Sequence, residues 1–176
     1  MDILNAASLK YLILFIALVL LQVLICNNVL LFGVAIPFIY IYFIIVLPLD
    51  LSLNMLMILA FLMGFFVDLF SDTLGLNSLS CLILAAVKKP IFYAYMPRED
   101  KFESAKPSVV SMGWANYLKF ILTLSGVFCI LIFGIELFSF ASFGRIVLMV
   151  VSSTVLTLLL ILAIDALFNK DYKTTW

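Results

Sequence analysis

The sequence has no charged residue over 11–49, a run of 39 residues. A helix of about 20 apolar residues crosses the hydrocarbon core of a bilayer, so this run is too long for one crossing and fits two. Asn27 and Asn28, two polar residues that favour turns, interrupt the run near its middle. The run therefore predicts two membrane-spanning helices, over about 9–26 and 29–47.

The rest of the chain follows the same pattern. Apolar residues make up 66% of the chain and charged residues 11%, whereas an ordinary soluble domain is about half apolar and about a quarter charged. Six crossings would use about 120 residues, which leaves no room for a second domain. We therefore predict an all-α integral membrane protein, a single domain over 1–176 built as a six-helix bundle. Its remaining spans are expected at about 51–70, 74–96, 117–135 and 146–167.

Lysine and arginine predict the orientation. With six crossings, both termini and the polar loop at about 88–116 lie on one side, which then carries every Lys and Arg except Arg145. Positive residues collect on the cytoplasmic side of inner-membrane proteins, so both termini are expected in the cytoplasm. Five basic residues of the loop are expected at the membrane surface, against anionic headgroups or a cytoplasmic partner: Lys88, Lys89, Arg98, Lys101 and Lys106.

Several kinds of chemistry are excluded by composition. The chain has no histidine, which removes Ser-His-Asp catalysis and histidine-ligated metal sites. Its cysteines, Cys26, Cys81 and Cys129, are isolated within apolar runs and are interpreted as buried packing residues. Because the net charge is zero, no overall field attracts nucleic acid. We expect no cofactor, no metal and no nucleic-acid partner.

The third predicted helix carries the main candidate site. Ala60, Gly64 and Asp68 follow one another at intervals of four and share one face. Small residues at that spacing let another helix approach closely, and the same face turns Asp68 toward the bundle or a cleft. Residues 71–78 come next, with polar side chains that can cap helix ends and a glycine that permits a tight entry into the fourth helix. The candidate partner or ligand contacts are Ala60, Gly64, Asp68, Asp72, Gly75 and Asn77.

The two acids of this region also have other interpretations. Asp68 and Asp72 could simply lie in the headgroup layer at the end of a span. Their spacing of one helical turn also invites comparison with paired-carboxylate catalysis. A lipid phosphotransferase would surround them with more acids, a glycine and an arginine, which do not follow here. An intramembrane aspartyl protease needs its second acid on another helix, and Asp165 is predicted at the opposite membrane face. We therefore expect a protein that is not an enzyme.

Motif and length together resemble one known family. Pro48 follows the second predicted helix, and later come Gly64-Phe65-Phe66-Val67-Asp68-Leu69-Phe70 and Leu74-Gly75-Leu76. This pattern, in a short chain with six predicted spans, resembles the bacterial rod shape-determining protein MreD. Within the motif, Gly64, Asp68 and Gly75 are the residues that are more than apolar filler. The chain departs from the family pattern at Asp72, where the family often has a small residue.

The resemblance implies a function and a set of partners. Members of this family are non-enzymatic components of the inner-membrane machinery that elongates the cell wall. The expected partner is MreC, a single-span protein, and through it MreB filaments and the glycosyltransferase RodA with its penicillin-binding transpeptidase. The family is also similar in fold to the substrate-binding subunits of energy-coupling-factor vitamin transporters. The alternative function is therefore that of a membrane subunit that binds a small, vitamin-like solute.

Overall fold

The computed structural model describes residues 2–28, 35–73, 75–96, 107–136 and 143–168. These residues form helices joined by turns and short irregular segments, which confirms the predicted all-α class. In chain order the elements are α1 (Asp2–Leu24), the short 3-10 helix η1 (Cys26–Asn28), α2 (Ile41–Val46), α3 (Leu53–Ser71), α4 (Leu76–Tyr95), α5 (Val109–Met112), α6 (Trp114–Glu136) and α7 (Phe143–Phe168).

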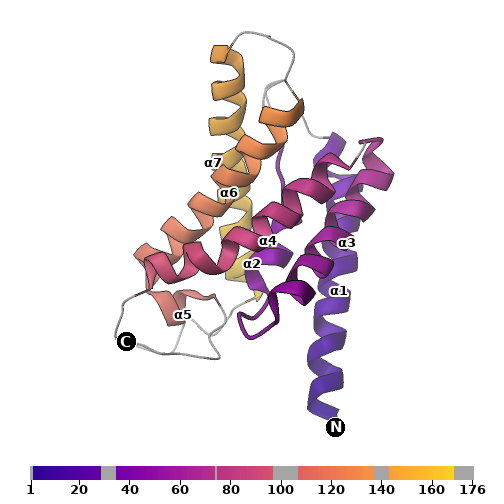
Figure 1. Cartoon of the computed structure of the whole chain (residues 1–176), viewed down its shortest axis with the longest axis vertical. Coiled ribbons are helices and arrows are strands. Elements are labelled where there is room, and N and C mark those ends of the chain that lie inside the picture. The colour runs from indigo at the N-terminus through magenta and orange to yellow at the C-terminus, as the bar shows by residue number, and fades with distance from the viewer. Residues whose placement is uncertain (1, 29–34, 74, 97–106, 137–142, 169–176) are drawn as a thin grey trace.

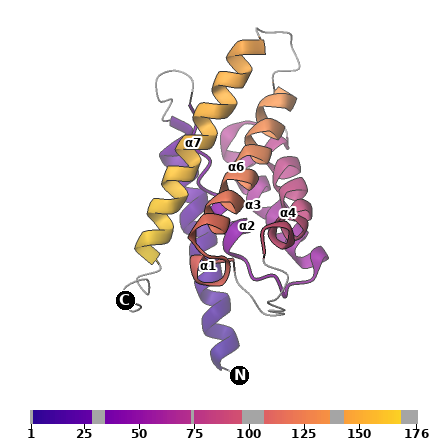
Figure 2. The ribbon, with the colours of Figure 1, turned by 90° about the vertical axis from the view of Figure 1, so that its left-hand side faces the viewer.

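Four helices, α3, α4, α6 and α7, are long and apolar enough to cross a membrane. Helix α1 adds a shorter apolar stretch at Leu9–Leu24. The long helices pack in chain order, α1 on α3, α3 on α4, α4 on α6 and α6 on α7, while α2 lies among them (Figure 1). The turned view in Figure 2 shows α7 lying beside α6.

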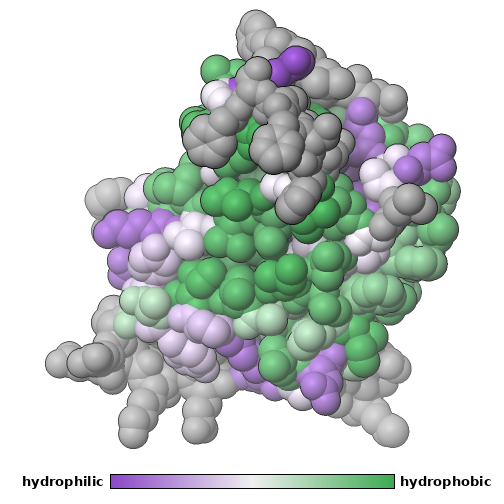
Figure 3. Space-filling model, turned by 45° about the horizontal axis from the view of Figure 1, so that its top comes forward, coloured by the Kyte–Doolittle hydropathy of each residue, from purple (hydrophilic) through white to green (hydrophobic). Residues whose placement is uncertain are grey.

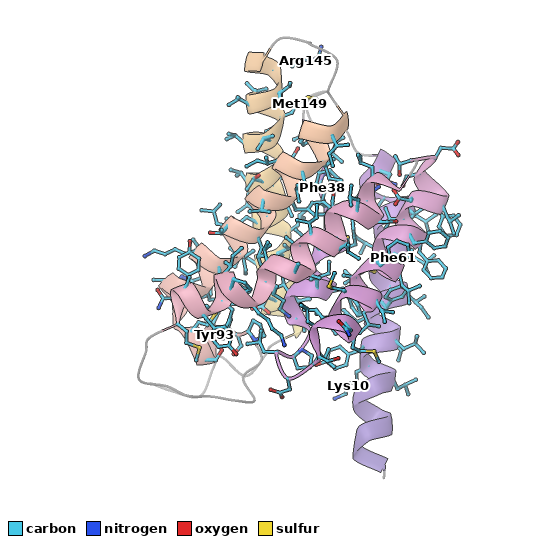
Figure 4. All side chains as sticks on the ribbon, in the orientation of Figure 1. Lys10, Phe38, Phe61, Tyr93, Arg145 and Met149 are labelled. Carbon is cyan, nitrogen blue, oxygen red and sulfur yellow. The ribbon has the colours of Figure 1, made fainter. Side chains whose placement is uncertain are left out.

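The two ends of the bundle are distinct. The N-terminal end of α1 and the C-terminal end of α7 lie at the same end of the molecule (Figure 1). Lys10 on α1 lies toward that end, and Arg145 at the start of α7 lies at the opposite one (Figure 4). The helices therefore place the two residues at opposite ends of the bundle.

The centre of the bundle is built around α2. Ile41, Ile44 and Ile45 are completely buried there. The outer faces of α1, α3 and α7, by contrast, present large exposed apolar side chains, and Phe61 on α3 points away from the body (Figure 4). Apolar residues cover the middle of the face seen in Figure 3, with polar residues toward its edges. Apolar side chains thus occupy both the core and much of the outer surface.

The predicted second helix, 29–47, is wrong as a continuous element. Only Ile41–Val46 is helical, residues 36–38 have no regular structure, and residues 29–34 lie outside the described residues. One reason is Pro37, which disfavours helical geometry at the residue before it. A second reason is that side chains of other helices bind the backbone of this segment and so replace the helical hydrogen bonds.

Three side chains hold this segment. The amides of Ile36 and Phe38 donate to the hydroxyls of Ser153 (3.0 Å) and Thr157 (3.1 Å) on α7. Gln22 on α1 accepts from the amide of Ile39 at 3.0 Å. Its own side-chain amide donates to the carbonyl of Pro37, also at 3.0 Å. Four backbone polar groups of this segment are therefore satisfied by side chains of the protein, as an apolar surrounding demands.

The two lysines of α4 also differ from expectation. Lys88 was expected at the membrane surface, but it is completely buried, and its ammonium group donates to the carbonyl of Leu47, the residue that ends α2. Lys89 is partly buried and donates to the carbonyl of Leu51 at 2.7 Å. Both lysines therefore bind the connection between α2 and α3, and the Leu47 carbonyl that Lys88 binds lies at the C-terminal end of α2, which attracts cations. The other three candidates, Arg98, Lys101 and Lys106, lie outside the described residues.

We predict that Lys88→Glu strongly destabilises the protein, because a buried carboxylate would face the Leu47 carbonyl with no counter-charge. The expected loss is about 3 kcal/mol or more, whereas Lys89→Glu, at a partly exposed position, should cost about 1 kcal/mol. The measurement is thermal unfolding in detergent with a thiol-reactive dye, since Cys26, Cys81 and Cys129 are all buried in the folded state. Equal losses for the two variants would contradict this prediction.

Candidate functional site

The candidate site lies at the corner between α3 and α4. Helix α3 ends at Asp72, whose backbone is left-handed with φ 55°, and α4 begins after Gly75, with φ 76°. The amide of Thr73 donates to the carbonyl of Asp68 at 3.3 Å, and that of Gly75 to the carbonyl of Thr73 at 2.9 Å. Two left-handed residues therefore reverse the chain within a few positions, and glycine makes the second of them inexpensive.

The carboxylate of Asp68 is the centre of this corner. Its Oδ1 accepts from the Thr73 hydroxyl at 2.5 Å, from the backbone amide of Asn77 at 3.0 Å and from the Asn77 side chain at 2.9 Å. Its Oδ2 accepts from the backbone amide and the hydroxyl of Ser78, at 2.8 and 2.5 Å. Five donors from the loop and from α4 thus converge on one buried side chain of α3.

This arrangement is a helix cap supplied by a neighbouring helix. The first amides of a helix lack partners within it and are usually bound by the side chain of the residue that precedes the helix. That residue is Gly75, which has no side chain, so Asp68 performs the task from α3. Its negative charge also lies at the positive end of the α4 dipole. We call Asp68, Thr73, Asn77 and Ser78 the Asp68 clasp.

Gly64 brings the two helices close enough for the clasp to form. A Cβ atom at this position would lie 2.5 Å from the Cα of Ser78 and 2.6 Å from the carbonyl oxygen of Asn77. Real Cβ atoms essentially never come so near to backbone atoms. A residue larger than glycine would therefore force α4 away from α3 and lengthen the hydrogen bonds to Asp68.

Tyr40 joins the clasp to the centre of the bundle. Its hydroxyl donates to Oδ1 of Asn77 at 2.6 Å, and its ring is completely buried. The ring packs edge-on against Phe38 and Phe128, with centroids 6.5 and 5.6 Å away. Phe38 lies inside the bundle in Figure 4. The clasp is thereby connected to the irregular segment that precedes α2.

A second polar connection reaches the corner from α1. The side chain of Gln22 donates to Asn27 of η1 at 3.0 Å, and Asn27 donates to the Ser71 hydroxyl at the end of α3 at 2.5 Å. Gln22 also binds the irregular segment, as described above. Gln22 therefore connects this segment, through Asn27, to the end of α3.

The structure brings four of the six candidate contacts together. Ala60, Gly64, Asp68 and Asn77 are buried between helices, whereas Asp72 and Gly75 are exposed in the turn. The helix that approaches the small-residue face at Gly64 is α4 of the same chain. Asp68 is only 5% exposed, so it is an interior residue and does not pair with Asp72 on the surface.

Sequence reasoning missed several members of the network. Thr73 and Ser78 carry a detectable signal, because hydroxyl residues near a helix start favour capping. Tyr40 lies in an apolar run and carries no such signal. Gln22, Ser153 and Thr157 are scattered over two predicted helices with no motif around them, yet all three bind the same irregular segment. Their convergence depends on the break before α2, which the apolar pattern hides.

No protein-family model matches this chain, and neither a curated protein nor a solved structure matches it.

We predict that Gly64→Ala destabilises the protein by about 1–3 kcal/mol, the usual cost of overpacking a closely packed contact. The matched control is Gly134→Ala near the end of α6, where a Cβ atom would meet nothing within 4 Å. The control should be neutral or stabilising by up to about 1 kcal/mol, since alanine favours helix. Thermal unfolding of both variants in detergent measures the difference. A Gly64→Ala variant as stable as the control would show that α4 has room to shift.

We predict a similar contrast between the two acids of the corner. Asp68→Asn replaces an acceptor oxygen by an NH₂ group that faces donors, so it should cost about 2–4 kcal/mol in buried hydrogen bonds. Asp72→Asn should leave stability unchanged within about 0.5 kcal/mol, because asparagine tolerates left-handed geometry well. Both values come from the same unfolding assay. A harmless Asp68→Asn change would mean that the clasp contributes little to stability.

Proposed function

We propose that this chain is a non-enzymatic scaffold of the bacterial cell-elongation machinery, located in the inner membrane. In this role it binds MreC and helps to couple MreB filaments to peptidoglycan synthesis by RodA and its penicillin-binding transpeptidase. The proposal includes six crossings, with both termini in the cytoplasm. It also includes a likeness in fold to the substrate-binding subunits of energy-coupling-factor transporters.

The observation that carries this proposal is the role of the three residues on which the resemblance depends. Gly64 allows α4 to approach, Asp68 caps α4, and Gly75 takes the left-handed conformation that starts it. Each of the three residues has a property that the corner between α3 and α4 requires. Their joint presence is therefore hard to explain as chance within an apolar sequence, and it supports membership of a family that shares this motif.

The distribution of polar groups supports a scaffold. The oxygens of Asp68 and the polar atoms of Gln22 are bound by other groups of the chain. The outer faces of α1, α3 and α7 are apolar. Surfaces of this kind fit lipid and the membrane helices of other proteins.

The six proposed crossings are α1, the segment around α2, α3, α4, α6 and α7. The second differs from the others, because its described part combines an irregular segment with one short helix. The cytoplasmic placement of both termini rests on the distribution of Lys and Arg. The N-terminal end of α1 and the C-terminal end of α7 lie at the same end of the bundle (Figure 1). This agrees with an even number of crossings.

One observation favours the second candidate function, a membrane subunit that binds a small solute. The helix break before α2 lies beside polar side chains of α1 and α7. Interrupted helices line the solute sites of many transporters. In this chain the polar side chains bind backbone groups of the segment itself, which makes the scaffold the better-supported function.

The test is purification of the tagged protein from bacterial membranes in mild detergent, followed by mass spectrometry of proteins and small molecules. We expect MreC, with wall-synthesis enzymes in smaller amounts, and the same recovery for Asp72→Asn as for the unmodified chain. A pair of ATPases with a coupling membrane subunit, or a stoichiometric solute, would replace the scaffold by the transporter subunit. Absence of MreC from every preparation would also contradict the proposal.

A further inference from the structure

The distance between two backbone donors in the irregular segment before α2 matches the distance between two hydroxyl acceptors on α7. Ile36 and Phe38 are two residues apart and bind Ser153 and Thr157, which are four residues apart. Two residues of extended chain cover about 6.6 Å, and four residues of helix cover about 6 Å. Two consecutive hydrogen bonds therefore form only while residues 36–38 stay extended. Helix α7 is the template that fits this conformation.

The same segment is also prepared to become helical. Tyr40 already has helical geometry, with φ −64° and ψ −20°. The amides of Tyr42 and Phe43 donate to the carbonyls of Ile39 and Tyr40, at 3.0 and 3.1 Å. Pro37 is well suited to the first position of a helix, because its fixed φ is helical and its missing amide is not needed there. A helix over 37–46 would thus need a change of conformation at only three residues, 37–39.

Each conformation uses different hydrogen bonds. In the extended form the hydroxyls of α7 bind the amides of Ile36 and Phe38, and Gln22 donates to the carbonyl of Pro37. In the helical form the carbonyls of Ile36 and Pro37 would accept from the amides of Tyr40 and Ile41. A helical segment would also bring Ile36 and Phe38 too close together to reach both Ser153 and Thr157. The two forms are therefore alternatives, and α7 stabilises one of them.

We propose that residues 36–41 form a two-state joint, which α7 holds extended and which winds onto the start of α2 when α7 moves away. Among the described helices α7 packs mainly on α6, and it binds α2 through the hydrogen bond from Tyr42 to Asp165, which must also break when α7 moves away. The hydrogen bond from Tyr40 to Asn77 keeps α2 in place. Winding shortens the three residues by about 5 Å.

The test is residue-resolved hydrogen exchange of the full chain in lipid nanodiscs. The variant Ser153→Ala with Thr157→Val removes both hydroxyls and keeps the volume of α7 nearly constant. We expect exchange at the amides of Ile36 and Phe38 to become at least tenfold faster, while exchange at Tyr40 and Ile41 becomes slower. The matched control is Ser152→Ala, whose hydroxyl binds the carbonyl of Leu148 within α7. The control should leave all four amides unchanged.

Two results would overturn the proposal. Faster exchange at all amides of 36–41 would show simple loosening without a helical alternative, and unchanged exchange at Ile36 and Phe38 would show that α7 does not hold the segment. The amides of Asn77 and Ser78 in the Asp68 clasp report whether the rest of the bundle remains folded. If the double variant does not fold, Thr157→Val alone gives the same test at Phe38 against Tyr40 and Ile41. None of these outcomes depends on the proposed role in cell elongation.

Discussion

The structure depends on one constraint, that a backbone amide or carbonyl inside an apolar bundle must find a partner in the protein. Helix ends create such groups, and here side chains from other helices bind them. Asp68 binds the first amides of α4, Lys88 binds a carbonyl where α2 ends, and Ser153 and Thr157 bind the segment before α2. Gln22, Asn77 and Ser78 belong to the same arrangement, whereas the buried hydroxyls of Ser80, Ser125 and Thr154 do not.

This use of polar groups also explains why the inside and the outside of the molecule differ. The small residue of α3, Gly64, lies against α4, where close approach allows hydrogen bonds to form. Large residues such as Phe61 and Phe65 lie on the outer face of the same helix, where they stack on each other. Specific contacts are therefore concentrated inside the bundle, and the outer face offers apolar area to lipid or to other membrane helices.

The sequence predicts the long helices well and the polar network poorly. Apolar runs between charges and turn residues are strong signals, so the expected segments 51–70 and 146–167 differ from α3 and α7 by only a few residues. The intervals between Ala60, Gly64 and Asp68 indicate a closely packed polar corner. They do not reveal that α4 of the same chain occupies it. The break at Pro37 was hidden because apolar residues surround it, and its partners lie more than a hundred positions away.

Hydrogen-bonding partners that lie far apart in the sequence come together later in synthesis than partners that lie close together. The bonds of the Asp68 clasp join residues at most ten positions apart, so the corner between α3 and α4 can close as soon as that hairpin leaves the ribosome. The extended form of residues 36–38 needs hydroxyls that are made 117 and 119 residues later. The early part of the chain must therefore wait in another conformation, and synthesis of α7 completes a site that was started near the N-terminus.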